Sequence, residues 1–219
     1  MNSLGISMTE RSFSFARGRV VAALVGAGLL LSACQGGSPT PGNSPTASSS
    51  SASPSASPTP TPSAKYVPAS AKGKAQNVPV PVKPALADQN SKAGLEAFTK
   101  YWFALLSYGY ETGDFKVWKT LTKPSCAFCM ALNERVVTSY KGGAWLVGGT
   151  IQTPSVAAQW KEGPGQQSVA VQVLQKRTDY YASPGKTSRA STPETNSGAA
   201  FFAVFEGGSW TVNEMGRLV

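Results

Sequence analysis

The sequence predicts an α+β domain in which helices pack on one face of a curved antiparallel sheet, a cone-shaped roll. Two observations carry this prediction. Apolar residues between positions 88 and 140 recur with the 3-4 spacing of helices, whereas from position 144 they occur in short runs with strand-like alternation. Helices followed by a meander of strands are typical of α+β folds rather than of alternating α/β folds.

A targeting segment precedes the folded part. Residues 1–33 have the three parts of a secretory signal peptide, with basic residues first, an apolar run from 20 to 31, and small residues at the end. The apolar run falls short of the ~20 residues of a membrane-spanning helix. We therefore expect a signal that is removed after export.

The end of the signal resembles the lipobox of bacterial lipoproteins. The residues that carry the resemblance are Leu31-Ser32-Ala33-Cys34. The resemblance implies diacylglycerol on the sulfur of Cys34, cleavage just before it, and attachment to the extracytoplasmic face of the cell membrane. Two acyl chains hold a protein at a membrane where one binds only reversibly. The alternative is an ordinary cleaved signal with a chance cysteine at the junction.

Residues 34–87 have the composition of a linker, since they are mostly Ser, Thr, Pro, Ala and Gly. Such a segment cannot bury enough apolar surface to order itself, so we expect a disordered spacer. Because the segment is rich in Ser and Thr, a stalk that is glycosylated on hydroxyl groups is an alternative.

The precursor has a formal net charge of +9. Lysines 65, 72, 74 and 83 give the linker a positive charge that anionic envelope lipids or polymers would attract. The alternative is that they only keep the tether solvated. Nucleic acid is not an expected partner, because an exported domain of small net charge without a binding motif is a poor candidate.

The domain itself, residues 88–219, begins with three predicted helices. The first has apolar residues at Leu95, Phe98, Trp102 and Leu105, with Asp88, Asn90 or Ser91 as its cap and Gly109 and Gly113 at its end. Asp114 caps a short second helix, and Ser125 caps a third that Gly142 and Gly143 end.

Five strand runs follow, at residues 144–151, 155–161, 168–181, 199–205 and 210–215. Gly148-Gly149 marks a bulge or bend inside the first run, and Gly207-Gly208 marks a hairpin. Residues 182–198 are rich in Ser, Thr and Pro, so a mobile loop is expected there.

Two resemblances emerge from these residues. The order of elements resembles the roll of nuclear transport factor 2 and ketosteroid isomerase. A second resemblance, to an uncharacterised family of secreted actinobacterial lipoproteins, is carried by Phe98, Tyr101, Trp102, Tyr108, Thr112-Gly113-Asp114, Leu121-Thr122, Pro124-Ser125-Cys126 and Cys129. That family has no assigned activity, so the resemblance implies a cellular location and a fold but no biochemical activity.

Catalytic residues are hard to find in this sequence. There is no histidine, the side chain most used as a general base near neutral pH and the commonest metal ligand. In roll enzymes an Asp or Tyr inside the cone does the work, which makes Tyr101, Tyr108 and Asp114 the nearest candidates. The competing interpretation is that the tyrosines belong to the core and Asp114 caps a helix. We expect no metal and no cofactor.

Cys126 and Cys129 are the two cysteines left if Cys34 is lipidated. Residues three apart in a helical turn lie ~5–6 Å apart, which a disulfide can bridge. An exported protein resides where thiols oxidise, so we expect a structural disulfide at the start of the third helix. A redox-active pair is the alternative, because C-x-x-C at a helix start is also the oxidoreductase spacing.

Three functions are consistent with these features. We favour a non-catalytic binding or interaction module for an envelope lipid, a small apolar ligand or a protein partner. A roll-type isomerase, dehydratase or hydrolase and a thiol-disulfide protein are the alternatives. A cone that is open and polar favours an enzyme, an apolar tunnel favours lipid binding, and a filled cone favours a protein partner.

Overall fold

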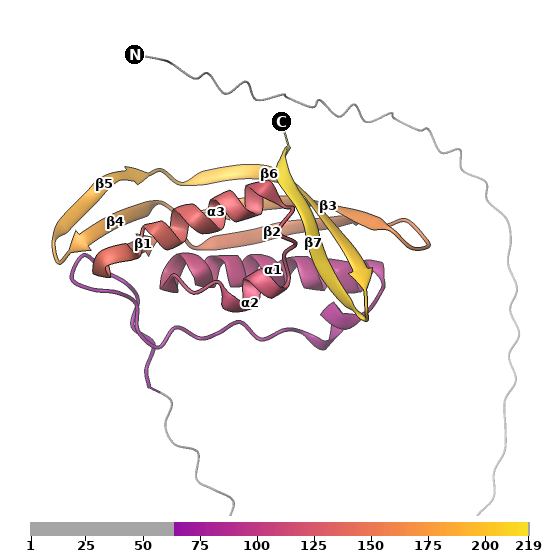
Figure 1. The fold of residues 1–219 in the computed structure, drawn as a ribbon, viewed down its shortest axis with the longest axis horizontal. Coiled ribbons are helices and arrows are strands. Elements are labelled where there is room, and N and C mark those ends of the chain that lie inside the picture. Colours follow the sequence, from indigo (N-terminus) through magenta and orange to yellow (C-terminus); the bar gives the residue numbers. More distant parts are fainter. Residues whose placement is uncertain (1–63, 219) are drawn as a thin grey trace, which may run out of the picture. The chain divides into compact units, whose positions relative to one another are not determined.

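The structure is a computed structural model that describes residues 64–218, and its fold is shown in Figure 1. Three α-helices come first within this range and seven β-strands follow them. The predicted α+β class is therefore confirmed. The predicted signal peptide, Cys34 and the first part of the predicted linker lie outside the described residues.

Helix α1, Lys92–Thr112, forms the centre of the domain. Of the three predicted caps, the structure uses Ser91, whose Oγ accepts a hydrogen bond from the backbone N–H of Gly94 at 3.0 Å. The helix ends at Gly113, whose left-handed conformation (φ 77°) favours glycine. Its last turn packs closely on the segment that follows, because a Cβ atom at Gly109 would lie 2.5 Å from the ring of Phe115.

Two shorter helices follow, α2 at Lys116–Thr120 and α3 at Ala127–Thr138. The predicted cap of the third helix is wrong by one residue, because the cap is Cys126, whose sulfur accepts the backbone N–H of Cys129 at 3.3 Å. After α3, one short 3-10 helix, η2 (Lys141–Gly143), leads into the strands.

The strands form two antiparallel sheets, with the orders β1-β4-β5 and β2-β3-β6-β7. The single curved sheet of the sequence prediction is thus divided in two. The strands are β1 (Trp145–Gly148), β2 (Ile151–Gln159), β3 (Gln166–Gln175), β4 (Thr178–Ser183), β5 (Lys186–Thr192), β6 (Thr195–Glu206) and β7 (Ser209–Leu218).

The division between the sheets lies at the predicted Gly148-Gly149 bend. Gly148 has φ 79°, and a Cβ there would lie 2.2 Å from the carbonyl oxygen of Arg177, so the chain requires glycine. Two backbone hydrogen bonds of 2.9 Å, Gly149 N–H to Arg177 O and Lys176 N–H to Thr150 O, connect the bent segments. The two sheets therefore follow each other end to end across this kink, because β1 runs on into β2 and β3 into β4.

The predicted mobile loop at residues 182–198 is wrong. These residues contain the end of β4, all of β5 and the start of β6. Polar pairs join β5 to β4, including Tyr180 Oη and Thr192 Oγ1 at 2.8 Å and the guanidinium of Arg189 over the ring of Tyr180. Hydrophobic alternation does not detect a strand of this kind, because β5 is almost entirely exposed.

The structure also places residues 64–87, which the sequence analysis assigns to the linker. We call residues 64–84 the N-terminal strap. Its small hairpin is closed by an antiparallel bridge between Val67 and Gln76. The hairpin is hydrogen-bonded to the domain, because Ser70 O accepts from Trp145 Nε1 and Ala71 O from Gly185 N, both at 2.8 Å.

After the strap comes one turn of 3-10 helix, η1 (Ala85–Asp88), where Ala87 is fully buried in the core. Residues within 64–87 therefore contact the domain that the sequence pattern begins at residue 88. Within residues 64–218, no helix has both the length and the hydropathy to cross a membrane.

Candidate functional site

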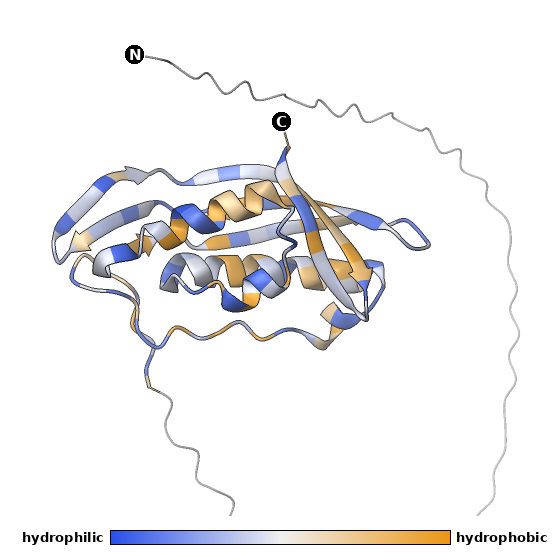
Figure 2. Ribbon diagram, viewed as in Figure 1, coloured by the Kyte–Doolittle hydropathy of each residue, from blue (hydrophilic) through white to orange (hydrophobic). Residues whose placement is uncertain are grey.

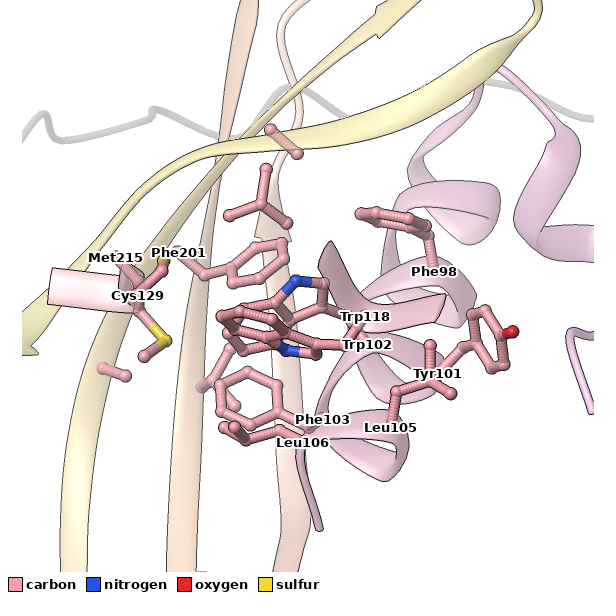
Figure 3. Packing of buried hydrophobic residues seen from close by; sticks show 14 of the residues in the cluster. Phe98, Tyr101, Trp102, Phe103, Leu105, Leu106, Trp118, Cys129, Phe201 and Met215 are labelled. Atoms are coloured by element: carbon pink, nitrogen blue, oxygen red, sulfur yellow. The ribbon is translucent and has the colours of Figure 1, made fainter. Parts of the chain in front are cut away.

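The space between α1 and the four-stranded sheet is filled by aromatic side chains (Figure 3). The ring of Trp102 lies 4.9 Å from that of Trp118 and 5.2 Å from that of Phe201, measured between centroids. These three side chains are almost completely buried. The space between α1 and the four-stranded sheet is therefore hydrophobic core.

The three candidate catalytic residues do not form one site. Tyr101 belongs to the core and is 8% exposed. Tyr108 and Asp114 line a small hollow of about 130 Å³ beside Trp118. An oxygen of Asp114 accepts the backbone N–H of Lys116 at 2.9 Å, at the start of α2. The core interpretation of Tyr101 is thus confirmed. The predicted cap of the second helix is wrong by one residue, because the cap position of α2 is Phe115, and Asp114 accepts the first backbone N–H of the helix from the position before it.

Cys126 and Cys129 lie at disulfide distance, as predicted. Their sulfur atoms are 2.00 Å apart and their Cα atoms 5.2 Å apart. Both residues are at most 1% exposed and belong to the hydrophobic core at the start of α3. Figure 3 shows Cys129 beside Met215 of β7. The pair joins the helix to its own first turn, away from solvent.

A larger hollow lies between the end of α3 and strand β5, and we call it the α3–β5 groove. It has a volume of about 410 Å³, within the range of small-molecule sites. Hydrophilic residues follow β5 along this side of the molecule (Figure 2). The groove is lined by Glu134, Arg135, Thr138, Ser139, Ser188 and Arg189.

Tyrosine side chains lie close to the groove. Tyr180 of β4 is 7% exposed and has the guanidinium carbon of Arg189 3.7 Å above its ring centroid. Burial raises the pKa of Tyr110, while Gln175 and the positive charges of Arg135 and Arg189 lower it in part. Tyr140 donates a hydrogen bond to the backbone oxygen of Tyr110 at 2.6 Å, and burial raises its pKa as well. Tyr110 and Tyr140 therefore stay neutral near pH 7.

Neither arginine of the groove belongs to a sequence pattern that predicts a functional residue. Arg135 is on the exposed face of a predicted helix, and Arg189 is in the segment predicted to be a loop. No local motif joins two arginines separated by fifty-four positions. The only sequence feature that points to this groove is the composition of β5, which is rich in Ser and Thr and contains basic residues.

Among residues 64–218, no group of three or more His, Cys, Asp or Glu side chains is placed to hold a metal ion. Two of the described carboxylates instead pair with basic side chains. Asp179 pairs with Arg177 at 3.0 Å, and Glu206 pairs with Lys123 at 3.1 Å. The groove is thus the site where cationic and hydroxyl groups from two separate elements come together.

Comparison with known proteins gives a family match and weak structural similarities. The model of a family of unknown function, DUF6318, matches residues 64–216. No curated protein matches the chain. The fold is similar to the intermembrane space region of the chloroplast protein ARC6, with 8% identity, 60% of this chain and 98% of that chain covered, and a TM-score of 0.45.

A further similarity is to an uncharacterised protein with a cystatin-like fold from Caulobacter vibrioides, with 13% identity, 55% of this chain and 87% of that chain covered, and a TM-score of 0.35. The predicted membership of an uncharacterised family is confirmed at the level of a family of unknown function. The actinobacterial lipoprotein family and the nuclear transport factor 2-like roll stay predictions. The match includes the N-terminal strap, in agreement with its contacts to the domain.

Proposed function

The chain belongs to this family of unknown function, and we propose that it is a lipid-anchored, extracytoplasmic binding module of the cell envelope that is not an enzyme. The signal-like residues 1–33 and the lipobox-like sequence ending at Cys34 support the anchor. Lipid on Cys34 would hold the domain at the outer face of the cell membrane through the segment that precedes residue 64.

The filled interior is the observation that carries the binding function. Trp102, Trp118 and Phe201 fill the space between α1 and the four-stranded sheet, where a roll-type enzyme would need room for its substrate. Open space of ligand size lies at the surface, in the α3–β5 groove. A filled core with a polar surface groove supports recognition of an external partner.

The two alternatives have weaker support. A roll-type enzyme would have to use the hollow at Tyr108 and Asp114, whose volume of about 130 Å³ is below the usual range for ligand sites. A thiol-disulfide protein needs an accessible sulfur, whereas Cys126 and Cys129 are at most 1% exposed.

Acyl labelling tests the anchor. In cells fed a palmitate analogue, we expect the wild type to be labelled and to fractionate with membranes. Replacing Cys34→Ser should abolish the label and leave the protein uncleaved or released to the medium. The double variant Cys126→Ser/Cys129→Ser is the control, because it removes the other cysteines and should still be labelled. Unchanged labelling of the Cys34 variant would contradict the anchor.

Native mass spectrometry of the full mature chain, taken from its own envelope in detergent, tests the binding function. We expect an added mass from a bound envelope molecule. Ser188→Trp fills the α3–β5 groove and should remove this mass, whereas Thr187→Trp, on a neighbour outside the groove lining, should not. Chemical conversion of envelope extract by the purified chain would contradict a non-catalytic role.

A further inference from the structure

Two cations line the α3–β5 groove without a carboxylate partner. The ion pairs among residues 64–218 are Lys83–Asp88, Lys123–Glu206 and Arg177–Asp179, and neither Arg135 nor Arg189 belongs to one. Arg135 comes from α3 and Arg189 from β5, so two separate elements bring both charges to one hollow. Such a convergence on a concave surface favours an anionic ligand.

The guanidinium of Arg189 is held in place before any ligand arrives. Its carbon lies 3.7 Å above the ring centroid of Tyr180, within the range of a cation–π contact. Tyr180 is itself fixed, because it is 7% exposed and its hydroxyl lies 2.8 Å from Thr192 Oγ1. A guanidinium stacked in this way keeps its N–H groups available at its edge, which suits two-point contact with an oxyanion.

Both arginines also act on one buried group beside the groove. Burial raises the pKa of Tyr110, and the positive charges of Arg135 and Arg189 each oppose that rise. Because the charges of both arginines act on the same buried phenol, both guanidinium groups lie on the same side of the domain. Their fields therefore add inside the groove.

The rest of the lining selects among anions. Thr138 and Ser188 contribute hydroxyl groups, whereas Ser139 already donates to the backbone oxygen of Arg135 at 2.9 Å. Glu134 and the C-terminal end of α3 add negative potential, which disfavours a bare ion. A ligand with hydroxyl groups beside its anionic group would meet both demands, because its hydroxyls can donate to Glu134.

We propose that the α3–β5 groove binds a phosphate group carried on a polyol, with Arg135 and Arg189 as its two cationic contacts. The proposal rests on the proposed binding function and names the ligand class of that same groove. Glycerol phosphate is the simplest such ligand, whether free, part of a wall polymer or part of a lipid head group.

Nuclear magnetic resonance titration of the mature chain carrying Cys34→Ser, so that it stays soluble, tests the site. We expect glycerol 3-phosphate to cause saturable shifts of the side-chain Nε–H signals of Arg135 and Arg189. Arg135→Gln should weaken binding about 10- to 100-fold, the loss of one charge-assisted contact. Arg217→Gln, on β7 and outside the groove lining, is the matched control and should bind as the wild type does.

One further variant, Arg189→Lys, keeps the outcome clear. Arg189→Lys retains the charge but not the planar fork, so we expect intermediate binding, and Arg135→Gln leaves the Tyr180 stack intact if Arg189 variants fail to fold. Linear, non-saturating shifts that Arg217→Gln reduces as much as Arg135→Gln does would overturn the site. Loss of phosphate binding with retained capture of another envelope molecule would overturn this inference alone and leave the proposed function standing.

A vesicle-binding experiment distinguishes a phosphate of a lipid head group from one of a soluble or polymeric ligand. Binding to phosphatidylglycerol vesicles that Arg135→Gln weakens and glycerol 3-phosphate displaces identifies a lipid head group. Saturable binding of glycerol 3-phosphate with no such vesicle component identifies a soluble or polymeric ligand. Both results support the site. The site is overturned if glycerol 3-phosphate shows no saturable titration and if vesicle binding is changed neither by Arg135→Gln nor by glycerol 3-phosphate.

Discussion

Thr122 links two tryptophans of the core through a single hydroxyl group. Its Oγ1 accepts a hydrogen bond from Trp102 Nε1 at 2.9 Å and donates one to the backbone oxygen of Trp118 at 2.8 Å. Thr122 is 4% exposed and Trp102 fully buried, so water cannot replace either bond. The aromatic core therefore depends on a polar contact that hydrophobic patterning does not reveal.

Replacing Thr122→Val keeps the shape of the side chain and removes both bonds. We expect the free energy of unfolding to fall by about 1–3 kcal/mol, because the indole N–H of Trp102 is left buried without an acceptor. Urea denaturation measures the loss. Thr120→Val is the matched control, since its hydroxyl bonds an exposed backbone oxygen, that of Val117. Equal losses in the two variants would show that the buried hydrogen bonds of Thr122 stabilise the fold no more than the exposed bond of Thr120 does.

Tyr66 of the strap donates a hydrogen bond to Glu111 near the end of α1. This bond, burial and the charge of Glu111 together raise the pKa of Tyr66 to about 12. A folded-state pKa above the ordinary value of 10 means that the neutral phenol stabilises the docked strap. That contribution is complete below about pH 10 and disappears as the pH rises towards about 12.

Labelling the tyrosine rings with carbon-13 allows this pKa to be measured by nuclear magnetic resonance. In Glu111→Gln the negative charge is gone, so we expect the titration of Tyr66 to move from about 12 towards its ordinary pKa. Tyr66→Phe assigns the signal. An unshifted titration in the Glu111 variant would mean that burial, and not Glu111, sets the pKa.

At the scale of elements, the strap is the largest difference from the sequence prediction. Its residues lack apolar periodicity, yet Ser70 and Ala71 are hydrogen-bonded to Trp145 and Gly185. Val80 contributes to the hollow beside Trp118. The strap is therefore held by hydrogen bonds to its backbone oxygens from residues that are 75 and 114 positions away in the sequence, and by single apolar contacts.

Removing the strap should destabilise the domain. A chain that begins at Ala64 should melt at the temperature of the full mature chain, because it keeps every described contact. A chain that begins at Pro84 loses the bonds of Tyr66, Ser70 and Ala71, so we expect a loss of about 2 kcal/mol and a melting temperature lower by roughly 4–8 °C. Differential scanning calorimetry compares the chains, and equal melting temperatures would return the boundary to residue 88.

Local pattern predicted the elements that have an apolar face. The spacing of Leu95, Phe98 and Trp102 located α1, and Gly148-Gly149 located the bend between the sheets. Pattern failed for β5, since its pairing depends on polar partners in β4 such as Tyr180. The α3–β5 groove depends on β5, so the groove could not be predicted either. By contrast, the pairing of Cys126 and Cys129 was predicted from their spacing together with the expected export of the chain.

At the scale of the whole molecule, the docked strap changes where the charge of the protein lies. Ala71 is bonded to Gly185, so Lys72 of the strap and Lys186 of β5 lie on neighbouring segments. Figure 1 shows the strap hairpin beside the turn between β4 and β5. We call Lys72, Lys74 and Lys186 the basic pole. The hairpin that carries Lys72 and Lys74 begins at Val67, three residues after the first described residue.

The basic pole should bind the surface of an anionic membrane. Each lysine near such a surface contributes ~1 kcal/mol, so replacing all three lysines of the pole by Gln should weaken binding to phosphatidylglycerol vesicles about 100-fold. Co-sedimentation of the unlipidated Cys34→Ser chain measures this. The control replaces Lys92, Lys100 and Lys119, which lie on α1 and α2, by Gln and removes the same net charge.

The control triple variant should lose far less than the pole variant, because only the lysines nearest the bilayer lie within a Debye length of its surface. Raising the salt concentration to ~0.5 M should release the wild type for the same reason. Binding that persists on neutral phosphatidylcholine vesicles would point to apolar insertion instead. Equal losses in the two triple variants would show that net charge alone attracts the chain, and that the docked strap does not orient it on the membrane.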